Sequence, residues 1–237
     1  LGNLDDVRTR AIEAACDEIL AGHLEGNFPL AVWMTGSGTQ FNMNMNEVIA
    51  KKAVQIAVAG GESITVHPND HVNRSQSSND VFPTAMHAAT LCLIEDRLFP
   101  AMDRLQSLLE KKAEEYKDIV KIGRTHLQDA TPLTLGQEIS GWARMIERNR
   151  EMLVQGCEFL RDLAAGGTAV GTGINCPNEF GPLFAEELSR LTGKVFRTAK
   201  NKFHSLTSKD ELVVAHGMLK ALACDLMKIA NDVRWLA

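Results

Sequence analysis

A heptad pattern near the carboxyl end of the sequence limits the possible folds more than any other feature. Apolar residues there recur at alternating spacings of three and four, which places them along one side of an α-helix. The stripe consists of Leu212, Ala215, Leu219, Leu222, Leu226, Ile229, Val233 and Leu236. Other apolar residues, such as Val214, Met218 and Ala221, lie off the stripe. A helix that is apolar on more than one face is buried on more than one side. We therefore predict a helical bundle larger than one chain, with an ordinary monomeric bundle as the alternative.

A second long helix is predicted upstream of the heptad helix. Its apolar stripe consists of Leu135, Ile139, Trp142, Ile146, Leu153, Leu160 and Leu163. The polar residue Asn149 interrupts this stripe. Helical spacing also covers residues 4–21, 42–59 and 80–118. In the last of these, Pro100 is expected to kink or break the helix.

Strand signals are weak throughout the sequence. The best candidate, Ser63–Val66, is short. The pattern therefore predicts a mainly all-α fold. We expect a partial N-terminal helical domain over residues 1–75 and a central long-helix bundle over residues 76–237.

The composition is that of a globular protein that can bury a core, with 45% hydrophobic and 23% charged residues among 237. The net charge of −5 argues against nucleic acid as the main partner. No apolar run approaches the length of a membrane span, and the sequence predicts no membrane association. The chain begins at Leu1 without an initiator Met, so we expect its natural start to lie elsewhere.

The cysteines indicate a reducing compartment. They are Cys16, Cys92, Cys157, Cys176 and Cys224, an odd number with no CxxC pair. Such scattered cysteines are typical of reduced thiols and offer no metal-binding spacing.

Three polar clusters precede predicted helices, at Thr35–Gln40, His67–Asp80 and Lys121–Pro132. Side chains of Ser, Thr, Asn and Asp can cap a helix, and the free N–H groups of a helix start attract anions. Any one such cluster on its own is most simply a capped polar turn. Three together indicate a site that holds carboxylates by neutral hydrogen bonds and helix dipoles.

The chemistry that suits these clusters is acid–base work on a small anion, with His126 moving the proton. His67, Asp70 and His71 lack typical metal-ligand spacing, so no metal is expected. The glycine-rich stretch 166–173 lacks the GxxxxGK[ST] pattern and a preceding strand, and it is not interpreted as a nucleotide site.

Together these motifs closely resemble the class II fumarate hydratases of the fumarase/aspartase superfamily. The resemblance is carried by Thr35-Gly-Ser-Gly-Thr-Gln, Asn42-Met-Asn-Met-Asn-Glu-Val-Ile-Ala, the stretch His67–Asp80, Gly123-Arg-Thr-His-Leu-Gln-Asp-Ala, Ala165-Gly-Gly-Thr-Ala-Val-Gly-Thr-Gly and Leu226-Met-Lys-Ile-Ala-Asn-Asp-Val-Arg-Trp-Leu. It implies a mainly helical homotetramer with a central bundle of long helices. Its active sites are shared between three subunits and need no cofactor.

The reaction that the resemblance implies is the reversible hydration of fumarate to L-malate in the tricarboxylic acid cycle. The implied location is the cytoplasm, or the mitochondrial matrix in a eukaryote. The implied catalytic residue is His126. The implied substrate-binding residues are Ser37, Gly38, Thr39, Ser77, Ser78, Asn79 and Thr125. A secondary carboxylate site would comprise His67, Pro68, Asn69 and Asp70.

One departure from the family pattern concerns a mobile Gly-Ser-Ser-x-Met-Pro-x-Lys-x-Asn-Pro loop, which should follow the Arg234-Trp235-Leu236 region. The chain stops at Ala237, so we expect it to be a fragment, lacking the C-terminal domain, with no turnover of its own.

Two alternatives stay open. The first is aspartate ammonia-lyase, which shares the fold but differs from the Gly36–Gln40 and Gln76–Asn79 runs found here. The second is a non-catalytic helical assembly protein, as in the lens crystallins of this superfamily. Loss of His126 would have favoured that second alternative, and His126 is present.

Overall fold

The chain is mainly helical, as the sequence predicts. The computed structural model describes residues 1–34 and 36–236. Contacts divide it into two compact units. Unit 1 comprises Leu1–His87 and Asp162–Ser208, and unit 2 comprises Ala88–Arg161 and Lys209–Ala237. The sequence-based division into residues 1–75 and 76–237 stays a prediction.

Unit 1 is built from short and medium helices. Its elements are α1 (Asp6–Leu20), η1 (Glu25–Asn27), α2 (Thr39–Ala59), η2 (Pro68–Val72), the first part of α3 (Ser78–Leu93), β3 (Asp162–Leu163), α6 (Phe180–Thr192), β4 (Arg197–Thr198) and α7 (Lys202–Thr207). Helices α1 and α2 pack through small side chains, with Ala15 and Ala53 completely buried. The parallel pair β3–β4 joins Asp162 to Arg197 and Leu163 to Thr198.

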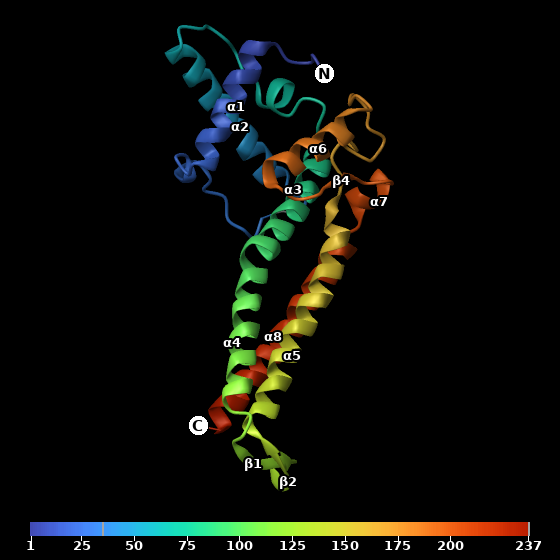
Figure 1. Ribbon diagram of the computed structural model, residues 1–237. Helices are drawn as coiled ribbons and strands as arrows, with labels where there is room; N and C mark the ends of the chain where they lie inside the picture. Colours follow the sequence, from blue (N-terminus) through green and yellow to red (C-terminus); the bar gives the residue numbers. More distant parts are fainter. Residues whose placement is uncertain (35, 237) are drawn as a thin grey trace. The chain divides into compact units, whose positions relative to one another are not determined.

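Unit 2 is an elongated bundle of long helices. After the end of α3, it contains η3 (Ile94–Leu98), α4 (Phe99–Glu115), β1 (Val120–Thr125), β2 (Gln128–Thr134), α5 (Leu135–Cys157), η4 (Glu158–Arg161) and α8 (Asp210–Leu236). Helix α5 packs against α4 and against α8, and the three helices run side by side in Figure 1. Among the residues that the structure describes, no helix is both long enough and apolar enough to cross a membrane.

The heptad helix is confirmed as α8, but its stripe is buried unevenly. Ala215, Leu222 and Ile229, each seven residues apart, are buried. In contrast, Leu226 is 39% exposed and Val233 is 52% exposed. One chain therefore covers only part of the apolar surface of α8. The prediction of a bundle larger than one chain stays a prediction.

The predicted helix over residues 80–118 changes its hydrogen bonding before Pro100. Over Ile94–Leu98 the backbone forms a π-helical segment, in which the Phe99 N–H bonds to the Ile94 carbonyl five residues back. A proline ring crowds the carbonyl four residues before it and offers no N–H. The wider turn ahead of Pro100 therefore fits the expected break, and α4 continues beyond it.

The strand predictions were wrong. Ser63–Val66 forms no strand, whereas β1 and β2 form an antiparallel hairpin over the cluster Lys121–Pro132. This cluster therefore lies in a hairpin and not at a helix start. Gly123 and Pro132 have low strand propensity, so the residue types in this segment did not predict a hairpin. A register shift between Ile122 and Arg124 accommodates Gly123.

Candidate functional site

The first polar cluster begins helix α2. Gly38 precedes the helix with a φ of 73°, in the left-handed region that favours glycine. A Cβ at this position would lie 2.2 Å from Cγ of Phe82, so only glycine fits. The Ser37 hydroxyl donates to Thr39 Oγ1 at 3.3 Å. Thr35, the first residue of the predicted motif, lies outside the described residues.

The predicted secondary carboxylate site forms a tight turn around His67. Its ring Nδ1 accepts hydrogen bonds from the backbone N–H groups of Asn69 and Asp70, each at 3.2 Å. A nitrogen that accepts hydrogen bonds carries no proton. The 3.3 Å approach of Asp70 to the same nitrogen is therefore no ion pair in this arrangement. Pro68 begins the short π-helical turn that follows.

The second predicted cluster caps helix α3. Ser77 Oγ accepts the backbone N–H of Asn79 at 3.2 Å, and Asp80 Oδ1 accepts the N–H of Ser77 at 2.9 Å. Ser78 is buried, and its hydroxyl accepts a hydrogen bond from Asn42 at 2.8 Å. The predicted capping is thus confirmed at Ser77, whereas the side chain of Ser78 bonds to Asn42 and not to the helix start.

The glycine-rich stretch 166–173, which the sequence left without a role, lies beside this helix start. The side-chain amide of Asn79 donates to the Ala169 carbonyl at 2.7 Å. The Ala165 N–H donates to Thr84 Oγ1 at 2.9 Å. Asp80 Oδ2 accepts the N–H groups of Gly166 and Thr168. Four hydrogen bonds therefore tie residues 165–169 to the first two turns of α3.

These segments enclose a pocket of about 1010 Å³ within unit 1. It is lined by the predicted residues Asn69, Asp70, Ser77 and Ser78, together with Arg74 and residues of the 168–177 segment such as Thr168, Asn175 and Cys176. The pocket therefore brings together residues of the predicted substrate and secondary carboxylate sites. Ser37, Gly38, Thr39, His67, Pro68 and Asn79 are not among its lining residues. Sequence reasoning missed Thr168, which directly follows Gly166 and Gly167 in the glycine-rich stretch.

A half-buried lysine of α7, Lys202, contacts the same region. Lys202 Nζ donates to the Leu163 carbonyl at 2.7 Å and to Thr198 Oγ1 at 2.6 Å. Burial lowers the pKa of Lys202 to about 8, against the opposing pull of the carboxylates of Asp80 and Asp162. The sequence offered no sign of this residue, because its environment is made by segments distant in the chain.

Because of Lys202, the free energy of unfolding should change with pH in the alkaline range. Its pKa falls from 10.5 in the unfolded chain to about 8 in the folded one. Between these values the unfolded chain binds the extra proton, so the free energy of unfolding rises as the pH rises. Chemical denaturation at about pH 7 and about pH 10 measures the free energy of unfolding at each pH. Its increase between the two should be smaller for Lys202→Met than for the wild type. Equal gains would contradict this assignment.

The predicted catalytic residue lies in unit 2, at the tip of the β1–β2 hairpin. His126 and Leu127 form its two-residue turn, with φ values of 49° and 61°. Such a turn prefers Asn-Gly, because both positions need positive φ. His126 is exposed and lines a pocket of about 350 Å³ with Lys121, Arg124, Glu138, Lys228, Asp232 and Trp235 among its other residues. Thr125 ends β1 beside it.

The strained turn makes His126 a functional candidate on structural grounds. Non-glycine residues in the left-handed region cost of order 1–3 kcal/mol each and gather at active sites. Lys121 pairs with Glu138, and Lys228 pairs with Asp232, which also accepts the indole N–H of Trp142 at 3.0 Å. The turn therefore presents an imidazole beside a network of paired charges.

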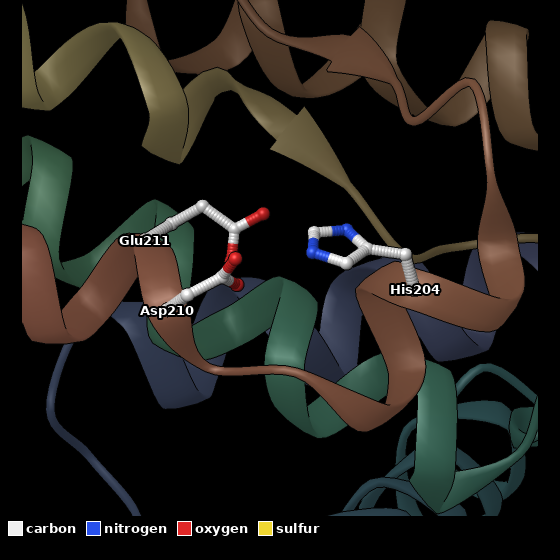
Figure 2. A group of neighbouring side chains, drawn as sticks. All are labelled: His204, Asp210 and Glu211. Atoms are coloured by element: carbon white, nitrogen blue, oxygen red, sulfur yellow. The ribbon is translucent and has the colours of Figure 1, made fainter.

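A possible metal-ligand group lies where α7 ends and α8 begins. Figure 2 shows its members, His204, Asp210 and Glu211. A histidine with two carboxylates is a donor set that a divalent cation can use. His204 belongs to unit 1, however, whereas Asp210 and Glu211 belong to unit 2. We therefore assign no metal to this group.

Known proteins match the whole of this chain. It is 61% identical over 237 residues to the class II fumarate hydratase of Bacillus subtilis (strain 168) and covers 51% of that protein. It is 57% identical over 240 residues to the class II fumarate hydratase of Helicobacter pylori (strain 26695), again covering 51%. The chain thus spans about half the length of the curated relatives it matches.

Solved structures share the same fold. The recombinant class II fumarase from Schistosoma mansoni superimposes with a TM-score of 0.93 at 38% identity, over 98% of this chain and 52% of that chain. The cobalt-bound fumarate lyase:delta crystallin from Brucella melitensis superimposes with a TM-score of 0.91 at 39% identity, over 98% of this chain and 50% of that chain. These matches confirm the predicted fold class.

The family description "Lyase" matches residues 2–237, which is nearly the entire chain. The predicted resemblance to class II fumarate hydratases is confirmed by the relatives above. The chain belongs to this lyase family.

Proposed function

We propose that the protein containing this chain is a fumarate hydratase, which reversibly adds water to fumarate to form L-malate in the tricarboxylic acid cycle. The observation that carries the proposal is the 61% identity to a class II fumarate hydratase over all 237 residues. The pocket of unit 1 supports it, because Arg74, Ser77 and Ser78, whose side chains carry hydrogen-bond donors, line the same space. Such donors suit a small dicarboxylate.

Neutral donors also suit the reaction. In the dehydration direction, a base removes the proton beside one carboxylate of malate. Negative charge then builds on the oxygens of that carboxylate, and donors fixed beforehand stabilise it more than they stabilise the substrate. The electron pair next forms the double bond of fumarate, and the hydroxyl group on the neighbouring carbon leaves as water after an acid gives it a proton. We place Ser77 and Ser78 in the role of charge-stabilising donors on the wall of the unit 1 pocket. The helix dipole of α3 adds to the same effect.

His126 is the proposed proton-handling residue, directly or through a water molecule. Imidazole changes protonation near neutral pH, which suits a group that must take up and release a proton in one cycle. Thr125, its neighbour at the end of β1, is proposed to bind substrate. We expect the scheme to need no cofactor, because acid–base chemistry of this kind uses only side chains and water.

We also infer that the protein is a homotetramer whose subunits share active sites. The exposed apolar side chains of α8 support this, with Met227 63% exposed and Val233 52% exposed. Such a helix gains stability when a further helix covers it. None of the five cysteines forms a disulfide in the part of the chain that the structure describes, which supports a reducing location such as the cytoplasm, or the mitochondrial matrix in a eukaryote.

The test is fumarate consumption by the full-length protein that contains this chain, followed by the ultraviolet absorbance of fumarate. We expect fumarate to disappear and L-malate to form. The same sample should release no ammonia from L-aspartate. Ammonia release without hydration would replace the proposal with an aspartate ammonia-lyase. The absence of both reactions would reject it in favour of a non-catalytic protein.

A further inference from the structure

One buried carboxylate joins two walls of the unit 1 pocket. Asp80 is completely buried. Its Oδ1 accepts the N–H of Ser77 at 2.9 Å, at the start of α3. Its Oδ2 accepts the N–H groups of Gly166 at 3.0 Å and Thr168 at 2.8 Å. Ser77 and Thr168 both line the pocket, so a single side chain fixes the backbone on both sides of it.

The pocket wall formed by residues 166–168 depends on the Asp80 carboxylate, because the backbone conformation of this wall is unfavourable. Thr168 has a φ of 53°, which a β-branched residue rarely adopts. The Thr168 hydroxyl is buried without a hydrogen-bond partner among the described residues, so this hydroxyl contributes no hydrogen bond to holding the loop. The hydrogen bond from the Thr168 N–H to Asp80 therefore helps to offset the cost of the strained backbone at Thr168.

The carboxylate is well supported in its buried position. Burial raises the pKa of Asp80, and the N–H groups of Ser77, Thr168 and Gly166 oppose that rise. The ammonium group of Lys202 also lies close enough to interact electrostatically with Asp80. Three N–H donors and a nearby cation compensate for the lost water, as a buried carboxylate requires.

We propose that Asp80 is a positioning residue for the reaction, which sets the distance between the Ser77–Ser78 wall and the Thr168 wall around the bound dicarboxylate. It does not touch the substrate itself. This inference rests on the proposed function, because fumarate is the ligand whose binding reports it.

The test is Asp80→Asn in the full-length protein. The amide has one acceptor oxygen, so its NH₂ group must face either Ser77 N–H or the N–H groups of the loop. One wall then shifts, and misplacement of about 1 Å can cost about a hundredfold in rate. We expect the KM for fumarate to rise by about tenfold or more. A merely structural role would instead lower the folded fraction, which reduces the apparent kcat and leaves KM unchanged.

Asp162→Asn is the matched control. Asp162 lies in the same unit, pairs with Arg197 at 2.9 Å and is half-exposed. Its substitution should leave KM unchanged. A second variant, Thr84→Val, removes the acceptor for the Ala165 N–H and loosens the same loop more gently. If Asp80→Asn does not fold, a raised KM in Thr84→Val supports the proposal and an unchanged KM overturns it.

Amide hydrogen exchange separates failure of this inference from failure of the proposed function. Asp80→Asn should speed exchange at Ser77, Gly166 and Thr168 compared with Asp162→Asn. An active wild type with an unchanged KM in Asp80→Asn overturns the positioning role alone. An inactive wild type overturns the proposed function, and with it the role of Asp80 in the reaction, even if the exchange pattern shows that the carboxylate holds both walls.

Discussion

The substitution His126→Asn is expected to lower the rate of fumarate hydration by about 10²-fold to 10⁴-fold, the range that general acid–base catalysis contributes. Asparagine still forms hydrogen bonds but cannot take up a proton near neutral pH. The measurement is kcat in the full-length protein, followed by fumarate absorbance. The fold should be unaffected, because Asn adopts the left-handed conformation more readily than His, and position 126 has a φ of 49°.

His23→Asn is the matched control for this substitution. His23 is also exposed in a turn, just after the end of α1, and its ring Nδ1 lies 3.1 Å from a carboxylate oxygen of Glu18. Its replacement should change kcat by less than about twofold, since surface pairs of this kind contribute little. If both variants kept wild-type turnover, or lost it equally, His126 would have no special part in the reaction.

The two long helices of unit 2 could be predicted because their periodicity is a local property of the sequence. The role of Asn149 could not, because it depends on a distant partner. It is 1% exposed, and its side-chain amide donates to Asp225 Oδ2 at 2.6 Å and to the Met145 carbonyl at 2.8 Å. Two helical turns earlier on α5, the indole N–H of Trp142 donates to Asp232 of α8. The apparent break in the stripe is thus a polar contact between α5 and α8.

These two contacts lie seven residues apart on each helix, from Trp142 to Asn149 and from Asp225 to Asp232. A buried polar contact at a heptad position fixes the register of neighbouring helices, since any slip would leave its groups unpaired. The sequence could not show which polar residues would pair. It therefore predicted the helices but not the register between them.

The candidate site shows the same division. The cap formed by Ser77 could be predicted, because a helix start is recognised from its neighbours in the chain. The role of Asp80 could not, because its partners Gly166 and Thr168 are 86 and 88 residues away in the sequence. The hairpin that carries His126 was missed because cross-strand pairing outweighed low strand propensity at Gly123 and Pro132. Local chemistry was therefore predictable, and its assembly was not.

The substitution Gly136→Ala is expected to lower the free energy of unfolding by about 3 kcal/mol, at the upper end of what overpacking usually costs. A Cβ at Gly136 would lie 2.3 Å from the Ala113 carbonyl oxygen and 2.7 Å from Lys117 Cα. These neighbours are backbone atoms at the end of α4. The Gly136 N–H donates to the Tyr116 carbonyl at 3.0 Å, so the two helices cannot separate without breaking that bond.

Gly141→Ala, in the same helix, is the matched control and should have the opposite effect. No atom lies within 4 Å of a Cβ at that position. Alanine in a helix interior is more stable than glycine by roughly 0.5–1 kcal/mol, because glycine loses more backbone freedom on folding. Chemical denaturation of both variants measures the two effects. Equal effects of the same sign would show that helix propensity alone decides both positions, and that the close approach of α4 and α5 at Gly136 does not constrain unit 2.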